Sequence, residues 1–186
     1  MRYSELIDAI ECCPIIAAVH EDSWQKALTA PPEIIFYLDA NLLTVKDRVL
    51  QAHSVGKKVF VHLDLADGIA KDKTAVQFLL ECGVDGIVST KPQIIRFAKE
   101  LNLLTVQRFF LLDTQGVENI SDMLNSTVPH FMELMPGLIN KVVKRFSQSS
   151  IPVIAGGLLE TKSEVTAALS CGAAAVSTSK EELWYL

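Results

Sequence analysis

PVIAGGL, residues 152–158, is a short apolar run that ends in two glycines, and GAAAVSTS, residues 172–179, is a second run that ends in hydroxyl side chains. Each has the character of a buried strand whose C-terminal end is small and rich in backbone donors. Glycine lets a ligand approach peptide N–H groups closely, and a helix after such a strand directs its positive end to the same place. In a (β/α)8 barrel, the loops after strands 7 and 8 commonly form a phosphate site. The two runs therefore predict a barrel that binds a phosphate or a similar oxyanion.

Six further apolar runs precede these two and alternate with segments of helical period. The eight predicted strands are Ile15–His20, Ile34–Asn41, Val59–Leu65, Gly86–Thr90, Leu104–Phe110, Phe131–Met135, Pro152–Ala155 and Ala174–Ser177. The amphipathic stretches between them include Val45–Val55, Thr74–Cys82, Gln93–Leu101, Leu138–Phe146 and Ser163–Ser170. Strands that are apolar on both faces and alternate with helices indicate an α/β fold with a parallel sheet buried by those helices.

Eight such repeats fit a closed (β/α)8 TIM-type barrel, with residues 1–186 forming one domain. The alternative is an open, doubly wound sheet, because 186 residues is slightly below the usual barrel range of about 200 or more. A barrel this compact needs shortened helices, and Glu21–Ala30 and Glu181–Leu186 are the expected places. Met1–Cys12 carries apolar residues at helical spacing, so we expect it to form a helix that caps the barrel floor.

The composition fits a globular protein and argues against several other classes. Hydrophobic residues make up 49% of the chain, which is ample material for a core. We expect a cytoplasmic protein with no membrane segment, because there is no long uncharged apolar run and no signal-like N-terminus. The four cysteines do not have metal-ligand spacing, so reduced thiols and no metal are expected. The net charge of −5 argues against broad electrostatic binding of nucleic acid but is compatible with a local basic patch.

Polar side chains near the ends of several predicted strands are expected to converge on one mouth of the barrel. Carboxylates among them offer acceptors for ligand hydroxyls or for a cation, and Lys91 and Arg108 offer positive charge. The candidates for these hydroxyl or charge contacts are Asp39, Asp64, Lys91, Gln107, Arg108 and Glu133. The candidates for binding phosphate, through a nest of backbone amides, are Gly156, Gly157, Ser177, Thr178 and Ser179.

Each of these features also has a purely structural interpretation. The glycine pair can form a tight βα turn, Ser177 or Ser179 can cap the last helix, and Asp64–Gly68 can be a turn. A group of acidic residues at the mouth can bind magnesium, since hard cations take oxygen ligands. The sequence contains no readable nucleophile–base pair or zinc motif. It therefore indicates a binding pocket more clearly than a reaction.

Seven segments spread over nearly the whole chain carry a further signal as a set. They are Pro14–Val19, Val59–Leu65 with Asp67–Ile69, Asp85–Lys91, Thr105–Thr114, Glu133–Gly137, Pro152–Leu158, and Val176–Ser179 with Leu183–Trp184. In this order they resemble the glycerol-3-phosphate-responsive antiterminator family. The resemblance implies a TIM-type barrel that binds glycerol 3-phosphate as an effector, with no other cofactor. It also implies a regulator whose ligand-bound form acts on the leader mRNA of glycerol uptake genes and prevents early transcription termination.

Two departures keep other functions open. Ser121–Pro129 matches the family only loosely, and the acidic net charge does not favour RNA. The chain can instead be a ligand-binding paralogue without RNA activity. It can also be a small barrel enzyme acting on a phosphorylated glycerol or triose derivative, with Asp64 or Glu133 as acid, base or magnesium ligand. The sequence does not decide whether the chain forms a homo-oligomer.

The candidate RNA contact is a basic helical face. Lys141, Lys144 and Arg145 stand at positions i, i+3 and i+4, which lie on one side of a helix. The alternative interpretation is an ordinary solvated surface. Phe146 is the one aromatic residue nearby, so base stacking of the kind seen in single-strand binders is not evident.

Overall fold

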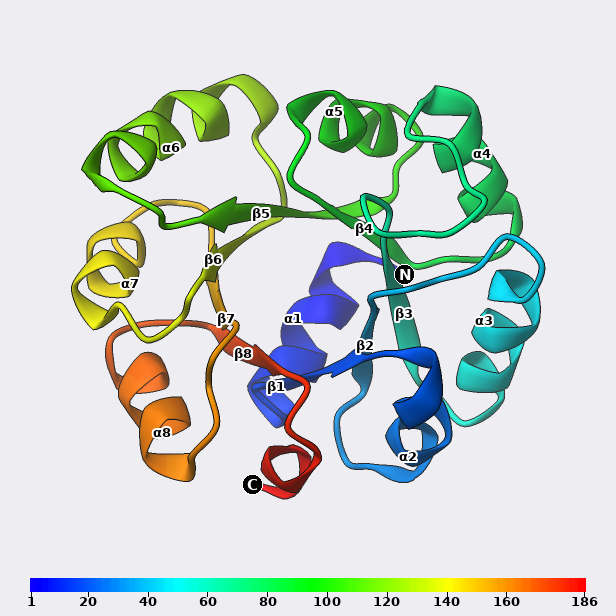
Figure 1. Ribbon diagram of the computed structural model, residues 1–186, viewed down its shortest axis with the longest axis horizontal. Coiled ribbons are helices and arrows are strands. Elements are labelled where there is room, and N and C mark those ends of the chain that lie inside the picture. Colours follow the sequence, from blue (N-terminus) through cyan, green and yellow to red (C-terminus); the bar gives the residue numbers. More distant parts are fainter.

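The computed structural model describes all 186 residues, and its strands form a closed parallel barrel (Figure 1). The strands are β1 (Ile15–Val19), β2 (Ile34–Tyr37), β3 (Lys58–His62), β4 (Gly86–Ser89), β5 (Leu104–Phe110), β6 (Phe131–Met135), β7 (Val153–Gly156) and β8 (Ala175–Thr178). Each strand pairs with the next in sequence, and β8 pairs with β1 in parallel through Ser177 and Ile16, which closes the barrel. The predicted (β/α)8 barrel is confirmed, and the open sheet is excluded.

Helices surround the barrel and face solvent on their outer side. They are α2 (Trp24–Thr29), α3 (Val45–Ser54), α4 (Lys73–Glu81), α5 (Pro92–Glu100), α6 (Thr114–Thr127), α7 (Asn140–Phe146) and α8 (Lys162–Ser170). The coverage is shortest where the sequence predicts it. A 3-10 turn, η1 (Glu21–Ser23), and the six-residue α2 follow β1, and only a 3-10 helix, η2 (Glu181–Tyr185), follows β8. No helix combines the length and the apolar character that crossing a bilayer requires.

The core has two layers, because successive strand residues point to opposite faces of the sheet. One set faces the helices and forms the larger apolar cluster, which includes both tryptophans. The other set fills the barrel interior with residues such as Phe36, Phe60 and Phe131. The N-terminal helix α1 (Tyr3–Cys12) packs Leu6 and Ile10 against this interior cluster and lies across one end of the barrel (Figure 1). The predicted floor helix is therefore present, and the opposite end of the barrel is where a ligand can enter.

Two strands end three or four residues earlier than the sequence predicts. β2 ends at Tyr37 rather than at Asn41, and β3 ends at His62 rather than at Leu65. Asp39 and Asp64 consequently belong to loops, where strand alternation no longer fixes the direction of their side chains. This shift decides where two of the predicted contact residues lie.

Candidate oxyanion site at the barrel mouth

A cavity of about 220 Å³ opens at the C-terminal ends of the strands, beside the β7–α8 loop and the end of β8. Arg108 and Glu133 reach it from β5 and β6. The lining residues are Ala18, Leu38, Arg108, Glu133, Met135, Gly157, Leu158, Leu159, Glu160, Ser177, Thr178, Ser179 and Lys180. The predicted phosphate residues of the two loops thus come together, with Gly156 directly before Gly157 at the end of β7.

The β7–α8 loop presents unpaired backbone donors at this cavity. Gly157 and Leu158 both have positive φ angles, of 71° and 59°, a conformation that favours glycine and costs other residues roughly 1–2 kcal/mol. The amides of Gly157, Leu158 and Ser179 lie outside the helices and strands and donate to no acceptor in the protein. Consecutive free amides in such a turn form a concave site for an anion.

The first turns of the helices that the sequence predicts at the pocket do not line it. At the start of α8, the Thr161 hydroxyl accepts from the Glu164 amide, and the Glu164 carboxylate accepts from the amides of Glu160 and Thr161. After β8 the chain enters the 3-10 helix η2, which has two glutamates in its first turn. That part of the prediction is corrected, because the donors in this cavity belong to loops rather than to helix N-termini.

Glu133 is the buried centre of the cavity floor. Its side chain is fully buried, and it accepts from Arg108 Nε at 2.5 Å and from Ser177 Oγ at 2.5 Å. The pairing of β5 with β6 sets Arg108 beside Glu133. A Cβ at Gly156 would lie 2.5 Å from Glu133 Oε1 and 2.6 Å from Ser177 Oγ, so the carboxylate occupies the space that a side chain at Gly156 would need.

A hydrogen bond and a longer polar contact extend this centre across the mouth to β3. Arg108 Nη1 lies 3.3 Å from His62 Nδ1, and His62 Nε2 lies 3.7 Å from Asp64 Oδ2. A guanidinium only donates, so Nδ1 accepts from Arg108, and Nε2 faces Asp64 without a hydrogen-bond partner. Asp64 also accepts from Ser89 Oγ and from the amide and hydroxyl of Thr90.

The environment of Asp64 favours its charged form. Burial by itself raises the pKa of the Asp64 carboxyl. The nearby His62 ring and the hydrogen bonds from the Thr90 amide and from the Ser89 and Thr90 hydroxyls outweigh burial and hold that pKa far below its ordinary value. Asp64 does not line the cavity, and it acts on the cavity only through His62 and Arg108.

Two of the predicted contact residues, Asp39 and Lys91, lie away from the cavity. Asp39 follows the early end of β2, and Lys91 is the N-cap of α5. Asp39 accepts from the Glu21 amide and lies 3.2 Å from His20 Nδ1, and it does not line the cavity. Lys91 is exposed and forms the N-cap of α5. The structure does not bring either side chain to the cavity.

Strand alternation also separates Gln107 from Arg108. Gln107 points outward from β5, where its amide oxygen accepts from Thr127 of α6 and its amide nitrogen has no partner. Arg108 is the residue that points into the barrel. Lys180, which the sequence interpretation missed, also lines the cavity; its position directly after the Ser-Thr-Ser run was the available signal.

The structure therefore defines a (β/α)8 barrel with a cavity at the mouth that is lined by its last two βα loops, the place where such barrels commonly bind phosphate. The sequence model of the "Glycerol-3-phosphate responsive antiterminator" family matches residues 15–184. The chain therefore belongs to this family. The resemblance seen in the sequence is confirmed, and the family is one of regulators, which supports the expectation that the chain is not an enzyme.

Three relatives match the chain over nearly their full length, and two of them carry antiterminator names. A glycerol uptake operon antiterminator regulatory protein from Listeria monocytogenes is 36% identical, with a TM-score of 0.88 over 92% of this chain and 95% of that one. An antiterminator-related protein from Thermotoga maritima is 32% identical, with a TM-score of 0.81 over 91% and 96% of the two chains. The uncharacterized protein YgcP of Escherichia coli K12 is 31% identical over 93% of this chain and 92% of its own.

Proposed function

We propose that the protein senses glycerol 3-phosphate in the cavity between β7 and β8, and that the ligand-bound form acts on the leader RNA of glycerol uptake genes. The observation that carries this proposal is the set of unpaired amides at Gly157, Leu158 and Ser179, three residues that line the same cavity as Glu133. Antitermination acts on nascent transcripts, so the proposal also places the protein in the cytoplasm.

The charges in the cavity give the ligand one orientation. Glu133 only accepts hydrogen bonds, so it repels a phosphate and attracts hydroxyls. The free amides and Lys180 lie at the loop side of the cavity and attract a phosphate. We therefore place the phosphate against Gly157 and Ser179 and the glycerol hydroxyls against Glu133.

Calorimetric titration tests this placement with three probes: glycerol 3-phosphate, glycerol and inorganic phosphate. Glycerol 3-phosphate should bind most tightly, phosphate weakly and glycerol not measurably, because only the first engages both ends of the cavity. Replacing Glu133 with Gln should reduce the preference for glycerol 3-phosphate over phosphate. Equal affinities for all three probes would contradict the assignment of the cavity.

The RNA part of the proposal needs a separate titration. If the binding of effector and RNA is coupled, glycerol 3-phosphate should raise the affinity of the protein for leader RNA. RNA should then raise the affinity for glycerol 3-phosphate by the same factor. Each phosphate that the protein contacts should add about −0.7 to the slope of log K for RNA binding against log salt concentration. Three or four contacts should therefore give a slope of about −2 to −3. A protein that binds the effector but no leader RNA at saturating ligand would be a paralogue without RNA activity.

A further inference from the structure

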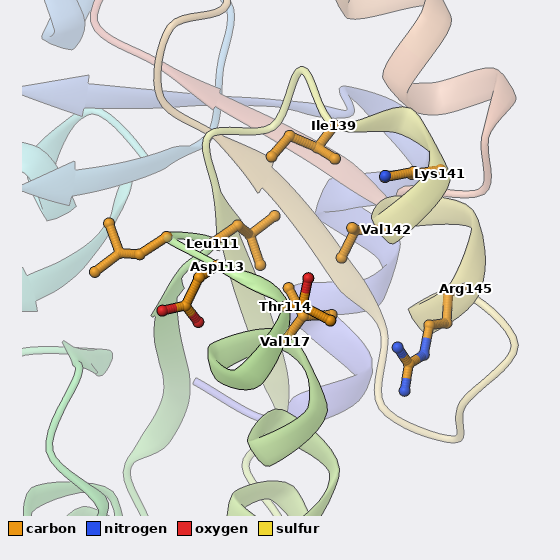
Figure 2. A pocket seen from close by; sticks show the side chains of 9 residues that line it. Leu111, Asp113, Thr114, Val117, Ile139, Lys141, Val142 and Arg145 are labelled. Carbon is orange, nitrogen blue, oxygen red and sulfur yellow. The ribbon is translucent and has the colours of Figure 1, made fainter.

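A second cavity, of about 410 Å³, lies between α6 and α7 (Figure 2). Its volume falls within the range of about 300–1,000 Å³ that is usual for small-molecule sites. One wall consists of the loop after β5 and the first turn of α6, and the other consists of α7. Nothing in the proposed effector site uses this cavity, and the two cavities have no lining residue in common.

The α7 wall carries two of the three basic residues that the sequence singles out. Lys141 and Arg145 line the cavity from one face of α7, whereas Lys144 does not line it. Between them, Val142 is nearly buried and closes the floor. The cavity thus combines cationic groups at its rim with an aliphatic interior.

The opposite wall adds an exposed leucine and an acceptor. Leu112 borders the cavity and is 88% exposed, so it packs against nothing in the core and is free to contact a ligand at the rim. Asp113 caps α6 by accepting from the Gly116 amide through Oδ1, and no donor in the protein engages its second oxygen. That oxygen can accept from an exocyclic amino group of a base, as carboxylates do with cytosine.

The two walls continue directly from strands of the effector site. The loop with Leu112 follows β5, which carries Arg108, and the segment before α7 follows β6, which carries Glu133. Leu111 donates to the Met135 carbonyl, and Gly137 donates to the carbonyls of Gly156 and Gly157. These bonds connect β6 and the Gly157 loop of the effector site to the segment leading into α7.

We infer that the cavity between α6 and α7 binds one unpaired nucleotide of RNA. Its base packs between Leu112 and Val142 with an amino group near Asp113, and its phosphate lies against Lys141 and Arg145. Unstacked bases are what proteins read in RNA, and an aliphatic cleft with cations at its rim matches both parts of a nucleotide. This inference rests on the RNA-binding part of the proposed function.

The test is a set of binding curves with the transcribed leader RNA of the glycerol uptake genes, at saturating glycerol 3-phosphate. Leu112→Asp removes the apolar cover and adds a like charge, and it should weaken RNA binding about tenfold or more. Lys141→Ala combined with Arg145→Ala should make the salt slope shallower by about 1.4, from two contacts at about 0.7 each. Both variants should bind glycerol 3-phosphate like the parent, since none of these side chains lines the effector cavity.

Matched controls come from the opposite side of the barrel. Leu43 is 86% exposed in the loop before α3, and Lys46 is exposed on α3. Leu43→Asp makes the same change as Leu112→Asp, and Lys46→Ala removes one surface cation; both should leave RNA binding unchanged.

The outcomes separate this inference from the proposed function. If the parent binds leader RNA and Leu112→Asp binds it equally well, the nucleotide site is wrong and the RNA-binding role stands. If Leu43→Asp weakens binding as much as Leu112→Asp, the effect is not specific to the cavity and the inference is also overturned. If the parent binds no leader RNA, the RNA-binding role and the nucleotide site fail together, whereas effector binding is still measured on its own.

Discussion

At the scale of single residues, the buried pair of Arg108 and Glu133 is the first determinant of the site. Each depends on the other, because a lone charge in the barrel interior has no water to solvate it. We expect Arg108→Met to lower the free energy of unfolding by about 3–5 kcal/mol, since it leaves Glu133 charged and unpaired. Adding Glu133→Gln should restore most of that loss, as measured by urea denaturation. A double variant no more stable than the single one would show that the pair is not a buried ion pair.

Gly157 combines a structural and a functional requirement. Its φ of 71° makes alanine costly by roughly 1–2 kcal/mol, and the new Cβ would lie 2.6 Å from Met135 Cε. Met135 lines the cavity, so its displacement should also weaken phosphate binding. Gly56→Ala is the control, because Gly56 has a φ of 80° and no atom within 4 Å of the added Cβ. Both variants should lose stability in urea, and only Gly157→Ala should lose affinity for phosphate.

Asp64 should make stability depend on pH in the acid range. Its pKa is lower in the folded state than the unfolded value of about 3.9. Its contribution to the free energy of unfolding is therefore complete above that pH and is lost as the pH falls below it. Urea unfolding at several values between about pH 5 and pH 2 should show a steep decline that Asp64→Asn makes shallower. An equal slope in both proteins would mean that the hydrogen bonds to Asp64 do not favour its charged form.

At the scale of elements, the start of α8 offers a clean separation of stability from binding. The Thr161 hydroxyl caps this helix, so Thr161→Ala should cost about 1 kcal/mol of stability. Because the capped amides do not face the ligand, the affinity for glycerol 3-phosphate should stay unchanged in calorimetry. If the variant also lost affinity, the N-terminus of α8 would be part of the binding site after all.

Elements also show where sequence patterns stop being informative. Strand runs are continuous and apolar, so all eight are readable, but α6 is absent from the predicted amphipathic stretches although it has 14 residues. Its buried residues are only Ile120, Leu124 and Thr127, and polar residues dominate the rest. Asp113 as N-cap, followed by apolar residues at helical spacing, was the signal that could have located it.

The site was only partly predictable for a related reason. In a barrel, a strand that ends in glycines or hydroxyl residues directs them to the mouth, so the residues at the ends of β7 and β8 could be placed from sequence. Gln107 and Arg108 are adjacent in one strand, and only the pairing of β5 with β6 decides which of them points inward. Asp39 depends on where β2 ends, which hydrophobic patterning leaves uncertain by a few residues.

At the scale of the whole molecule, effector binding and folding should be linked. The barrel interior is packed and closed by α1 at its floor, so the proposed cavity exists only in the folded chain. At a glycerol 3-phosphate concentration of 100 times the dissociation constant, stability should rise by about 2.7 kcal/mol. Thermal denaturation with glycerol as the control measures this, and an equal shift from glycerol would contradict a phosphate-dependent site.

The missing side chain at Gly156 has a consequence for how this family varies. Glu133, Ser177 and Gly156 share one small volume, so a change at one position constrains the other two. A relative with alanine at the position of Gly156 should carry a shorter acid, such as aspartate, at the position of Glu133. An aligned set of antiterminators can test this, because the three positions should change together rather than singly. Where they do, the volume at the centre of the mouth is what evolution has kept constant.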